Sequence, residues 1–233
     1  MNKPVCLVAG VGPGNGLAIS QRFAAAGYRV AMLARNQAAL TELVAAVPDA
    51  HGFVCDLTDA KAVEDVVAKI REQLGVAETV VYNAGSGVRG RALDIALEDF
   101  TLAWKVNALG LLALAQVVVP DMVAAGKGNL LVTGATASLR GGENFAAFAS
   151  AKAAQRSLAQ SLARAYGPQG VHVALVIIDG VIDIPRTRAL LGDKPDNFFL
   201  QPTAIAESVY QLSLQHPSAW TFELDLRPSG ERW

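Results

Sequence analysis

Short runs rich in β-branched residues alternate with segments of helical periodicity from one end of the chain to the other. The predicted strands are residues 5–9, 29–34, 52–55, 79–82, 129–133, 171–178 and 219–226. The predicted helices are residues 16–26, 37–46, 59–74, 96–125, 145–166 and 203–214. Apolar strands separated by helices are typical of a parallel sheet covered on both faces, with right-handed crossovers. The alternation therefore predicts an α/β fold with a doubly wound, seven-stranded parallel sheet.

The chain carries no linker and no internal repeat, so residues 1–233 are predicted to form a single domain. Apolar residues make up 52% of the sequence and charged residues 18%, which excludes an intrinsically disordered chain. The formal net charge is -1 and no basic run is present, which argues against nucleic acid as a partner. Residues 184–202 contain three prolines, show no clear periodicity and form a candidate lid.

No membrane span and no secretory leader are predicted. The longest apolar runs, residues 108–115 and 173–178, are shorter than the roughly 18 residues that a membrane helix needs. The apolar run at the N-terminus meets a glycine cluster too early for a secretory signal. The only cysteines, Cys6 and Cys55, lie in predicted buried strands separated by the second strand, so they should remain unpaired. These features predict a cytoplasmic protein.

A glycine-rich turn follows the first predicted strand and opens the first predicted helix. It places glycines at positions 10, 14 and 16, with Asn15 between the last two. Backbone amides and the helix N-terminus can approach a pyrophosphate there, where a Cβ atom would obstruct it. A methyltransferase also uses such a turn but typically has an acidic residue near the strand end, where this chain has the neutral Ala9. The turn therefore predicts a phosphate cradle.

Further motifs lie after the third and fourth strands and in the two long helices. They consist of Asp56, Leu57, Asn83, Ala84, Gly85, Asn107 and Lys152. With these residues the whole chain resembles the classical short-chain dehydrogenase/reductase family. The resemblance implies a Rossmann-type fold, a nicotinamide cofactor, oxidoreductase activity on a small molecule, and a homodimer or homotetramer.

The resemblance also implies roles for individual residues. Asp56 contacts the adenine ring, and the Asn83-Ala84-Gly85 turn packs beside the adenosine ribose. Lys152 holds the nicotinamide ribose, while the backbone at Ile182 holds the carboxamide. The implied cofactor-binding residues are Gly10, Gly14, Asn15, Gly16, Arg35, Asp56, Leu57, Asn83, Ala84, Gly85, Lys152 and Ile182.

The end of the second strand bears on the choice of cofactor. An acidic residue there would chelate the ribose hydroxyls, whereas a guanidinium would pair with a 2′-phosphate. This chain has Arg35 and no carboxylate, so NADP(H) is predicted in preference to NAD(H). Pro13 stands where NADP-binding relatives often have a second basic residue, so the predicted preference is modest. The alternative is that Arg35 is a solvated loop residue.

The catalytic pattern of the family is broken in this chain. Four residues before the Lys, the family has a Tyr that transfers the proton, and thirteen residues before the Tyr it has a Ser that binds the substrate carbonyl. Here these positions are Phe148 and Ala135, and the alternative Tyr position of enoyl reductases is Phe145. Asn107, which in relatives orders a water that relays protons toward the Lys, is present together with Lys152.

Several groups are candidates to replace the missing hydroxyls. They are Ser138 as a catalytic proton donor, a water bound to Lys152, the carboxyl of Asp179 and, more weakly, Thr136. Asp179 stands where relatives have a proline. Ile184 likewise replaces a Thr that helps to bind the cofactor, and Thr187 is the nearest substitute.

Two functional interpretations stay open. General acid–base catalysis contributes ~10²–10⁴ in rate and one transition-state hydrogen bond ~10²–10³, so the positioning of a nicotinamide can survive both losses. The favoured interpretation is an NADP(H)-dependent oxidoreductase acting on an alcohol or carbonyl with an atypical proton relay. The alternative is a non-catalytic NADP(H)-binding regulatory or assembly protein.

No metal site is predicted for the three histidines. An apolar substrate is predicted from Phe145, Phe148, Phe198 and Phe199.

Overall fold

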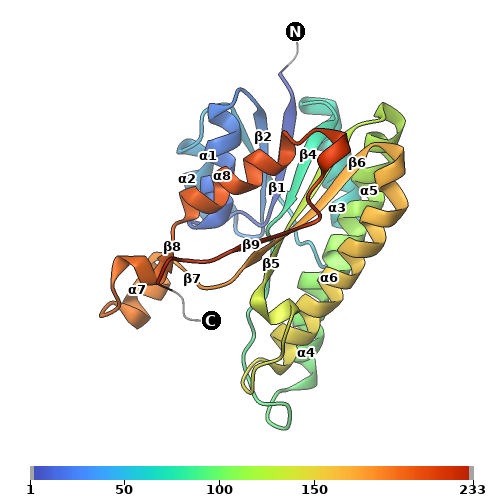
Figure 1. Ribbon diagram of the computed structural model, residues 1–233. Helices are drawn as coiled ribbons and strands as arrows, with labels where there is room; N and C mark the ends of the chain where they lie inside the picture. Colours follow the sequence, from blue (N-terminus) through green and yellow to red (C-terminus); the bar gives the residue numbers. More distant parts are fainter. Residues whose placement is uncertain (1–2, 231–233) are drawn as a thin grey trace.

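The protein is described by a computed structural model covering residues 3–230. One parallel sheet runs through it in the order β3-β2-β1-β4-β5-β6-β9 (Figure 1). Its strands are β1 (Val5–Ala9), β2 (Arg29–Ala34), β3 (Ala50–Val54), β4 (Ala77–Tyr82), β5 (Gly128–Ala135), β6 (Val171–Ile178) and β9 (Glu223–Leu226). Every neighbouring pair is parallel, which confirms the predicted doubly wound, seven-stranded sheet.

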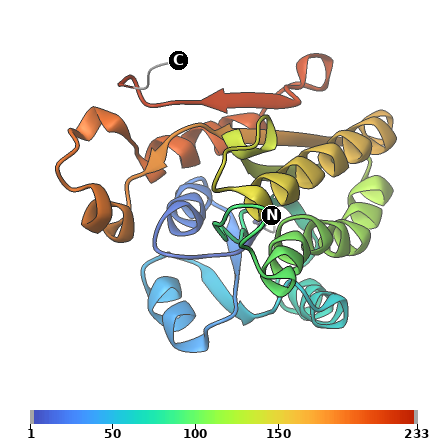
Figure 2. The same ribbon diagram turned by 90° about the horizontal axis from the view of Figure 1, so that it is seen from below.

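Helices cover both faces of the sheet (Figures 1 and 2). One face holds α1 (Asn15–Ala25), α2 (Gln37–Ala45) and α8 (Pro202–Ser213). The other holds α3 (Ala60–Gln73), α4 (Leu97–Trp104), α5 (Gly110–Ala125) and α6 (Ala146–Tyr166). The inner strands β1 and β6 are buried along their whole length, which explains why they are almost continuously apolar in the sequence.

Both cysteines are buried and unpaired, as predicted. Cys6 lies on β1 and Cys55 follows β3, and β2 lies between these two strands. Burial raises the pKa of the Cys55 thiol to about 11 and raises that of Cys6 well above its usual value. Thiols that hold their protons so firmly are poor nucleophiles, so packing is the role that this structure supports.

The long helix predicted for residues 96–125 is interrupted by one π-helical turn, Lys105–Leu109, between α4 and α5. The Tyr82 hydroxyl donates a hydrogen bond to the Val106 carbonyl in this turn. A Cβ atom at Gly110 would lie 2.5 Å from the Tyr82 hydroxyl oxygen, so glycine permits the close approach. Single π-helical turns are frequent at functional sites, and this one contains Asn107.

The continuous helical segment Leu97–Ala125 is long and apolar enough to cross a membrane by length and composition alone, with a mean hydropathy of 1.9. The sequence prediction considered only uninterrupted apolar runs and did not detect it. Half of the most apolar window is buried inside the protein, where Leu111 and Leu114 pack into the core beneath the sheet. Such burial is typical of a core helix.

The segment predicted as an irregular lid contains a helix, α7 (Pro185–Leu191), and projects from the body (Figure 2). At its base β7 (Val181–Ile182) pairs in parallel with β8 (Phe199–Leu200). The Arg188 guanidinium lies 2.6 Å from Asp183 and 2.8 Å from Asp196. Ion pairs rather than an apolar stripe stabilise this segment, so hydrophobic periodicity could not predict it.

The last strand also begins later than predicted, because a 3₁₀ turn occupies Pro217–Ala219.

Candidate functional site

The glycine-rich turn between β1 and α1 is shaped largely by the protein's own packing. Gly10 has φ +91°, and a Cβ atom there would lie 2.5 Å from the Ala84 Cα atom. A Cβ atom at Gly16 would lie 2.7 Å from the Val11 Cα atom. At Gly14 it would meet Ile184 at 2.7 Å, whereas Gly12 faces open space. The turn therefore brings bare backbone to a surface that a ligand can reach.

The start of α1 suits an anion. Gly14 is its N-cap and supplies no side-chain cap, and the first turn contains no acidic residue. The free amides and the positive end of the helix dipole remain available to a phosphate group. Asn15 is 8% exposed, and within residues 3–230 its Oδ1 atom has no hydrogen-bond partner. The local geometry fits the pyrophosphate that the sequence predicts.

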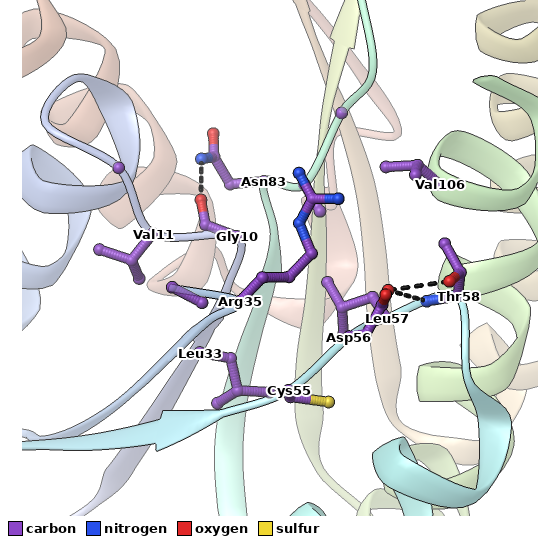
Figure 3. A pocket seen from close by; sticks show the side chains of 14 residues that line it. Gly10, Val11, Leu33, Arg35, Cys55, Asp56, Leu57, Thr58, Asn83 and Val106 are labelled. Atoms are coloured by element: carbon purple, nitrogen blue, oxygen red, sulfur yellow. Dashed lines mark hydrogen bonds between the residues drawn. The ribbon is translucent and has the colours of Figure 1, made fainter. Parts of the chain in front are cut away.

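A cavity of about 260 Å³ lies where the loops after β1, β2, β3 and β4 meet (Figure 3). The predicted cofactor-binding residues that line it are Gly10, Arg35, Asp56, Leu57, Asn83, Ala84 and Gly85. The exposed Arg35 side chain extends toward the loop that carries Asn83 (Figure 3). The carboxyl ends of adjacent parallel strands meet at one edge, which explains why residues so distant in sequence converge.

Two polar side chains of this cavity are held by the protein. The Asp56 Oδ1 atom accepts hydrogen bonds from the Thr58 amide at 2.9 Å and from its hydroxyl at 2.8 Å. The Thr58 amide, with a smaller contribution from nearby Arg35, lowers the pKa of Asp56. Asn83 donates to the Gly10 carbonyl at 2.8 Å and accepts from Thr133 at 3.3 Å. The cavity therefore presents a fixed carboxylate and a turn tied to β1 and β5.

Lys152, on α6, is 5% exposed and lies near this cavity. Its Nζ atom donates to the Thr133 carbonyl and to Gln155 Oε1, each at 2.9 Å. A Cβ atom at Gly85, which lines the cavity, would lie 3.8 Å from the Lys152 Nζ atom. Burial lowers the pKa of Lys152 to about 7, so its ammonium group can lose a proton near neutral pH.

Gln155 is a site residue that the sequence did not reveal. Its Nε2 atom donates to the Asn107 backbone carbonyl at 2.9 Å while its Oε1 atom accepts from Lys152. The amide thus bridges Lys152 and Asn107, between which the resemblance implied a water. The available signal was the spacing of three residues between Lys152 and Gln155, which places both on one helix face.

The Asn107 side chain is buried in the π-helical turn. Its Nδ2 atom donates to the carbonyls of Ser86 at 3.1 Å and Ala103 at 2.8 Å. Its Oδ1 atom has no hydrogen-bond partner within the part of the chain that the structure describes. A buried amide oxygen without a partner is costly, so this atom marks a place where a donor group fits.

A second cavity, of about 400 Å³, lies beyond Lys152 along α6. Ala135 and Phe148, which replace the family's Ser and Tyr, both line it, together with Phe145. Phe198 and Phe199 do not line it, and Phe199 is buried beneath the Arg188 guanidinium, 4.0 Å from its ring centroid. The predicted apolar pocket therefore contains only half of the proposed phenylalanines.

The predicted substitutes for the missing hydroxyls are engaged elsewhere. Ser138 does not line the second cavity, and its hydroxyl donates to the Ala135 carbonyl at 2.7 Å. Asp179 is 7% exposed, lies 3.0 Å from the Arg227 guanidinium and accepts a hydrogen bond from Thr136. A serine bonded to its own turn and a carboxylate paired with a guanidinium are both poor proton donors. These partners do not favour Ser138, Asp179 or Thr136 as the proton donor, and their expected roles stay predictions.

The segment that follows β6 contacts the glycine-rich turn, since a Cβ atom at Gly14 would meet the Ile184 side chain. Ile182 is paired with Leu200 across the small β7–β8 sheet. The Thr187 hydroxyl accepts from the Ile184 amide at 3.1 Å and contacts the Ile182 carbonyl. Thr187 thus organises the start of α7 and is not a free hydroxyl. Within residues 3–230, no group of three or more His, Cys, Asp or Glu side chains could hold a metal ion.

Sequence comparisons agree with this architecture. A family model described as short chain dehydrogenase matches residues 4–191. The chain is 34% identical over 185 residues to the 3-oxoacyl-(acyl-carrier-protein) reductase MabA of Mycobacterium avium, covering 79% of this chain and 69% of that relative. It is 28% identical over 203 residues to the 3-oxoacyl-(acyl-carrier-protein) reductase FabG of Escherichia coli, covering 86% and 82%.

Solved structures lead to the same family. A short-chain dehydrogenase from Rhodopseudomonas palustris has a TM-score of 0.84 at 33% identity, covering 97% of this chain and 98% of that one. An alcohol dehydrogenase from Thermococcus sibiricus, complexed with 5-hydroxy-NADP, has a TM-score of 0.87 at 26% identity, covering 99% of each chain. With the glycine turn, the Asn-Ala-Gly turn and Lys152 in place, this chain belongs to the classical short-chain dehydrogenase/reductase family.

Proposed function

We propose that the protein is an NADP(H)-dependent oxidoreductase acting on an alcohol or a carbonyl, with Lys152 in place of the missing tyrosine as the proton-transferring group. The observation on which this depends is that Lys152, although it lines neither cavity, is close to residues of both. Its Nζ atom lies beside Gly85 of the first cavity, and Phe148, one helical turn away, lines the second. The known activities of relatives, such as 3-oxoacyl-(acyl-carrier-protein) reduction, support an oxidoreductase.

The first cavity is proposed to hold the adenosine part of the cofactor, which when bound supplies or accepts a hydride at its nicotinamide. Arg35 would pair with the 2′-phosphate and Asp56 would accept a hydrogen bond from the adenine ring. The amides at the start of α1 would bind the pyrophosphate. The 5-hydroxy-NADP complex of the Thermococcus sibiricus relative supports the choice of NADP(H) over NAD(H).

The second cavity is proposed to hold the substrate. Reduction of a carbonyl needs one proton besides the hydride, and that proton would come from the Lys152 ammonium group. A pKa of about 7 suits this task, because such a group gives and takes protons readily near neutral pH. Thr133 and Gln155 accept two of the three ammonium hydrogens, so the third is left to be transferred.

The same geometry also favours a second candidate, a cofactor-binding protein without turnover. Gln155 bridges Lys152 and Asn107 by a side-chain amide, which holds its protons and cannot relay them as a water does. Proton supply to Lys152 would then depend on access from the cavities. Under this alternative, Phe148 and Ala135 would be losses that no other residue compensates.

Turnover by the purified protein separates the two functions. NADPH oxidation would be followed across a panel of aldehydes, ketones and quinones, with NADPH binding measured by calorimetry on the same samples. Replacement of Lys152 with methionine is expected to reduce turnover by about 10²–10⁴-fold. Turnover that survives in Lys152→Met would exclude Lys152 as the acid. Tight NADPH binding without turnover of any compound would favour the non-catalytic function.

We also propose that the protein forms a homodimer or homotetramer and is cytoplasmic. The outer surfaces of α5 and α6 form an apolar groove, whose residues include Leu112, Val119, Val123 and Leu162. A second copy could cover this groove. Light scattering that finds a 24.4 kDa particle at micromolar concentration would contradict the oligomer. The two reduced, buried cysteines support a reducing compartment.

A further inference from the structure

The second cavity has an apolar floor and a cationic rim. Ala135, Phe148 and Ile178 form its floor with aliphatic and aromatic groups. Arg89 and Arg140 line the same cavity, from the loop after β4 and the loop after β5, and both side chains are exposed. This division into an apolar and a charged part is the pattern of a site for an amphipathic ligand.

No carboxylate balances the two arginines within the described residues. Neither Arg89 nor Arg140 lies within 4.0 Å of an acidic side chain in residues 3–230, and no acidic residue lines the cavity. Glu143, on the same loop as Arg140, lies 3.5 Å from Arg91, which is outside the lining. Asp179, below the floor, is paired with Arg227. The cavity therefore carries two positive charges open to a ligand.

The two loops that carry these arginines are tied to each other. The Gly90 amide donates to the Asn144 carbonyl at 2.9 Å, and the Ala146 amide donates to the Gly90 carbonyl at 3.3 Å. The Arg89 guanidinium lies over the Phe145 ring, 5.1 Å from its centroid, which is cation–π distance. The loop backbones and the Arg89 side chain are thus held in place before a ligand arrives, which lowers the entropy that binding must overcome.

We propose that this cavity recognises a substrate with an anionic head group, a carboxylate or a phosphate, held at Arg89 and Arg140 while its apolar part and reacting carbonyl lie against Phe148 and Ala135. The inference rests on the proposed oxidoreductase function, because it names the substrate class of that site. Guanidinium groups bind both head groups through paired N–H donors. A polyhydroxylated substrate fits poorly, since its hydroxyls would lose hydrogen bonds on the apolar floor.

The cofactor does not account for these charges. The first cavity, proposed for the adenosine part, shares no lining residue with the second. Arg35 is the arginine that lines the first cavity and can meet the 2′-phosphate there. Arg89 and Arg140 belong to the substrate side of the site, beside the positions where relatives hold the reacting carbonyl.

Matched pairs of keto acids and their methyl esters test the proposal. The probes are phenylglyoxylate, 4-oxo-4-phenylbutanoate and 5-oxo-5-phenylpentanoate, each compared with its ester, and phenyl phosphate. Binding to the protein saturated with NADP⁺ is measured by calorimetry. We expect at least one acid to bind about tenfold or more tightly than its ester, because a hydrogen bond to a charged group contributes that much. The affinity of phenyl phosphate relative to the acids distinguishes the two head groups.

Charge-removing variants locate the effect. Arg89→Gln and Arg140→Gln should each weaken acid binding about tenfold and leave the esters unchanged. Arg91→Gln removes the same charge from the same loop outside the cavity and should change neither, since an exposed ion pair contributes little. The proposal is overturned when no acid binds more tightly than its ester, or when the preference survives in the double Arg89→Gln, Arg140→Gln variant.

The same samples distinguish failure of this inference from failure of the proposed function. Arginine-dependent binding of an acid without NADPH oxidation would support the anion site and contradict the oxidoreductase. Equal NADPH-dependent reduction of acids and esters, in the unmodified protein and in the double variant, would support the oxidoreductase and overturn the anion site.

Discussion

The two cavities of this protein differ in how much of the family's pattern they keep. The first retains the glycine turn, Asp56 and the Asn83 turn, and the fold brings them together as the sequence predicted. The second has Phe148 and Ala135 in place of two hydroxyls, and the neighbouring Gln155 bridges Lys152 and Asn107. The residues that the family uses are therefore kept around the first cavity and partly replaced around the second.

The physical reason lies in what each cavity is made of. The glycine turn beside the first cavity is required by the fold, since a Cβ atom at Gly10 or Gly16 would meet the backbone of Ala84 or Val11. The second cavity is lined by Ala135 and Phe148, which are both only half-buried, so a substitution at either position changes the groups that a ligand meets. A glycine fixed by packing resists substitution, whereas a half-buried side chain at a cavity accepts it more readily.

The largest effect is expected at the glycine turn. Gly10→Ala places a Cβ atom 2.5 Å from the Ala84 backbone at a φ of +91°, and we expect it to destabilise the fold by about 3 kcal/mol or more. Gly12→Ala is the matched control, because it meets nothing within 4 Å. Urea unfolding should show a lower free energy of unfolding for Gly10→Ala alone. Calorimetry should show weaker NADPH binding for Gly12→Ala, because Gly12 lines the first cavity. Equal stability of the two variants would contradict the backbone argument.

Restoring the two hydroxyls tests the divergence of the second cavity. Phe148→Tyr combined with Ala135→Ser should raise NADPH-dependent reduction of generic ketones by about 10²-fold, because the phenol would supply a proton near Lys152. Each buried hydroxyl could destabilise the fold by about 1–3 kcal/mol without a partner, so rates are compared on folded, NADPH-saturated protein. A double variant that binds NADPH and stays inert, while the unmodified protein turns over its own substrate, would show that this pocket serves a different chemistry.

The cofactor preference is expected to depend on a single side chain. Arg35→Ala should weaken NADPH binding about 10–100-fold through loss of a charge-assisted pair with the 2′-phosphate, and should leave NADH binding nearly unchanged. Calorimetric titration with both cofactors measures the ratio. An equal loss of affinity for NADPH and NADH would contradict the preference for NADP(H) but not the proposal that this cavity binds the cofactor.

The smallest effect concerns the protonation of Lys152. Burial lowers its pKa in the folded protein to about 7 from the ordinary lysine value of 10.5. Between these values the unfolded chain binds more protons, so this group makes the protein more stable as pH rises, by up to about 1.4 kcal/mol per pH unit. Gln155→Glu would place a carboxylate beside Lys152 and raise the pKa of Lys152 in the folded protein. The rise in the free energy of unfolding should then begin at a higher pH.

Urea unfolding between pH 6 and pH 9 measures this shift. Lys152→Met serves as the reference, because subtracting its pH dependence removes the contributions of other groups. Identical difference curves for the unmodified protein and Gln155→Glu would show that Gln155 does not control the charge of Lys152.

Much of the fold was predictable from local pattern. The bounds of β1, β2 and β6 match the predicted strands, since short apolar runs bounded by turn residues are typical of buried parallel strands. The helix α7 and the π-helical turn were not predictable in this way. The former depends on the ion pairs of Arg188, and the latter on the contact of Tyr82 with the helix backbone. Neither interaction leaves a periodic signal.

The sequence by itself determined the sheet, the glycine turn and the family, because periodicity and short motifs encode local backbone geometry. Only the tertiary structure decided which groups are available for chemistry. Gln155 reaches the Asn107 carbonyl across 48 positions, and Thr136 bonds to Asp179 across 43. Such contacts follow from how helices and loops pack against the sheet, and a polar side chain's reactivity depends on whether another group already holds it.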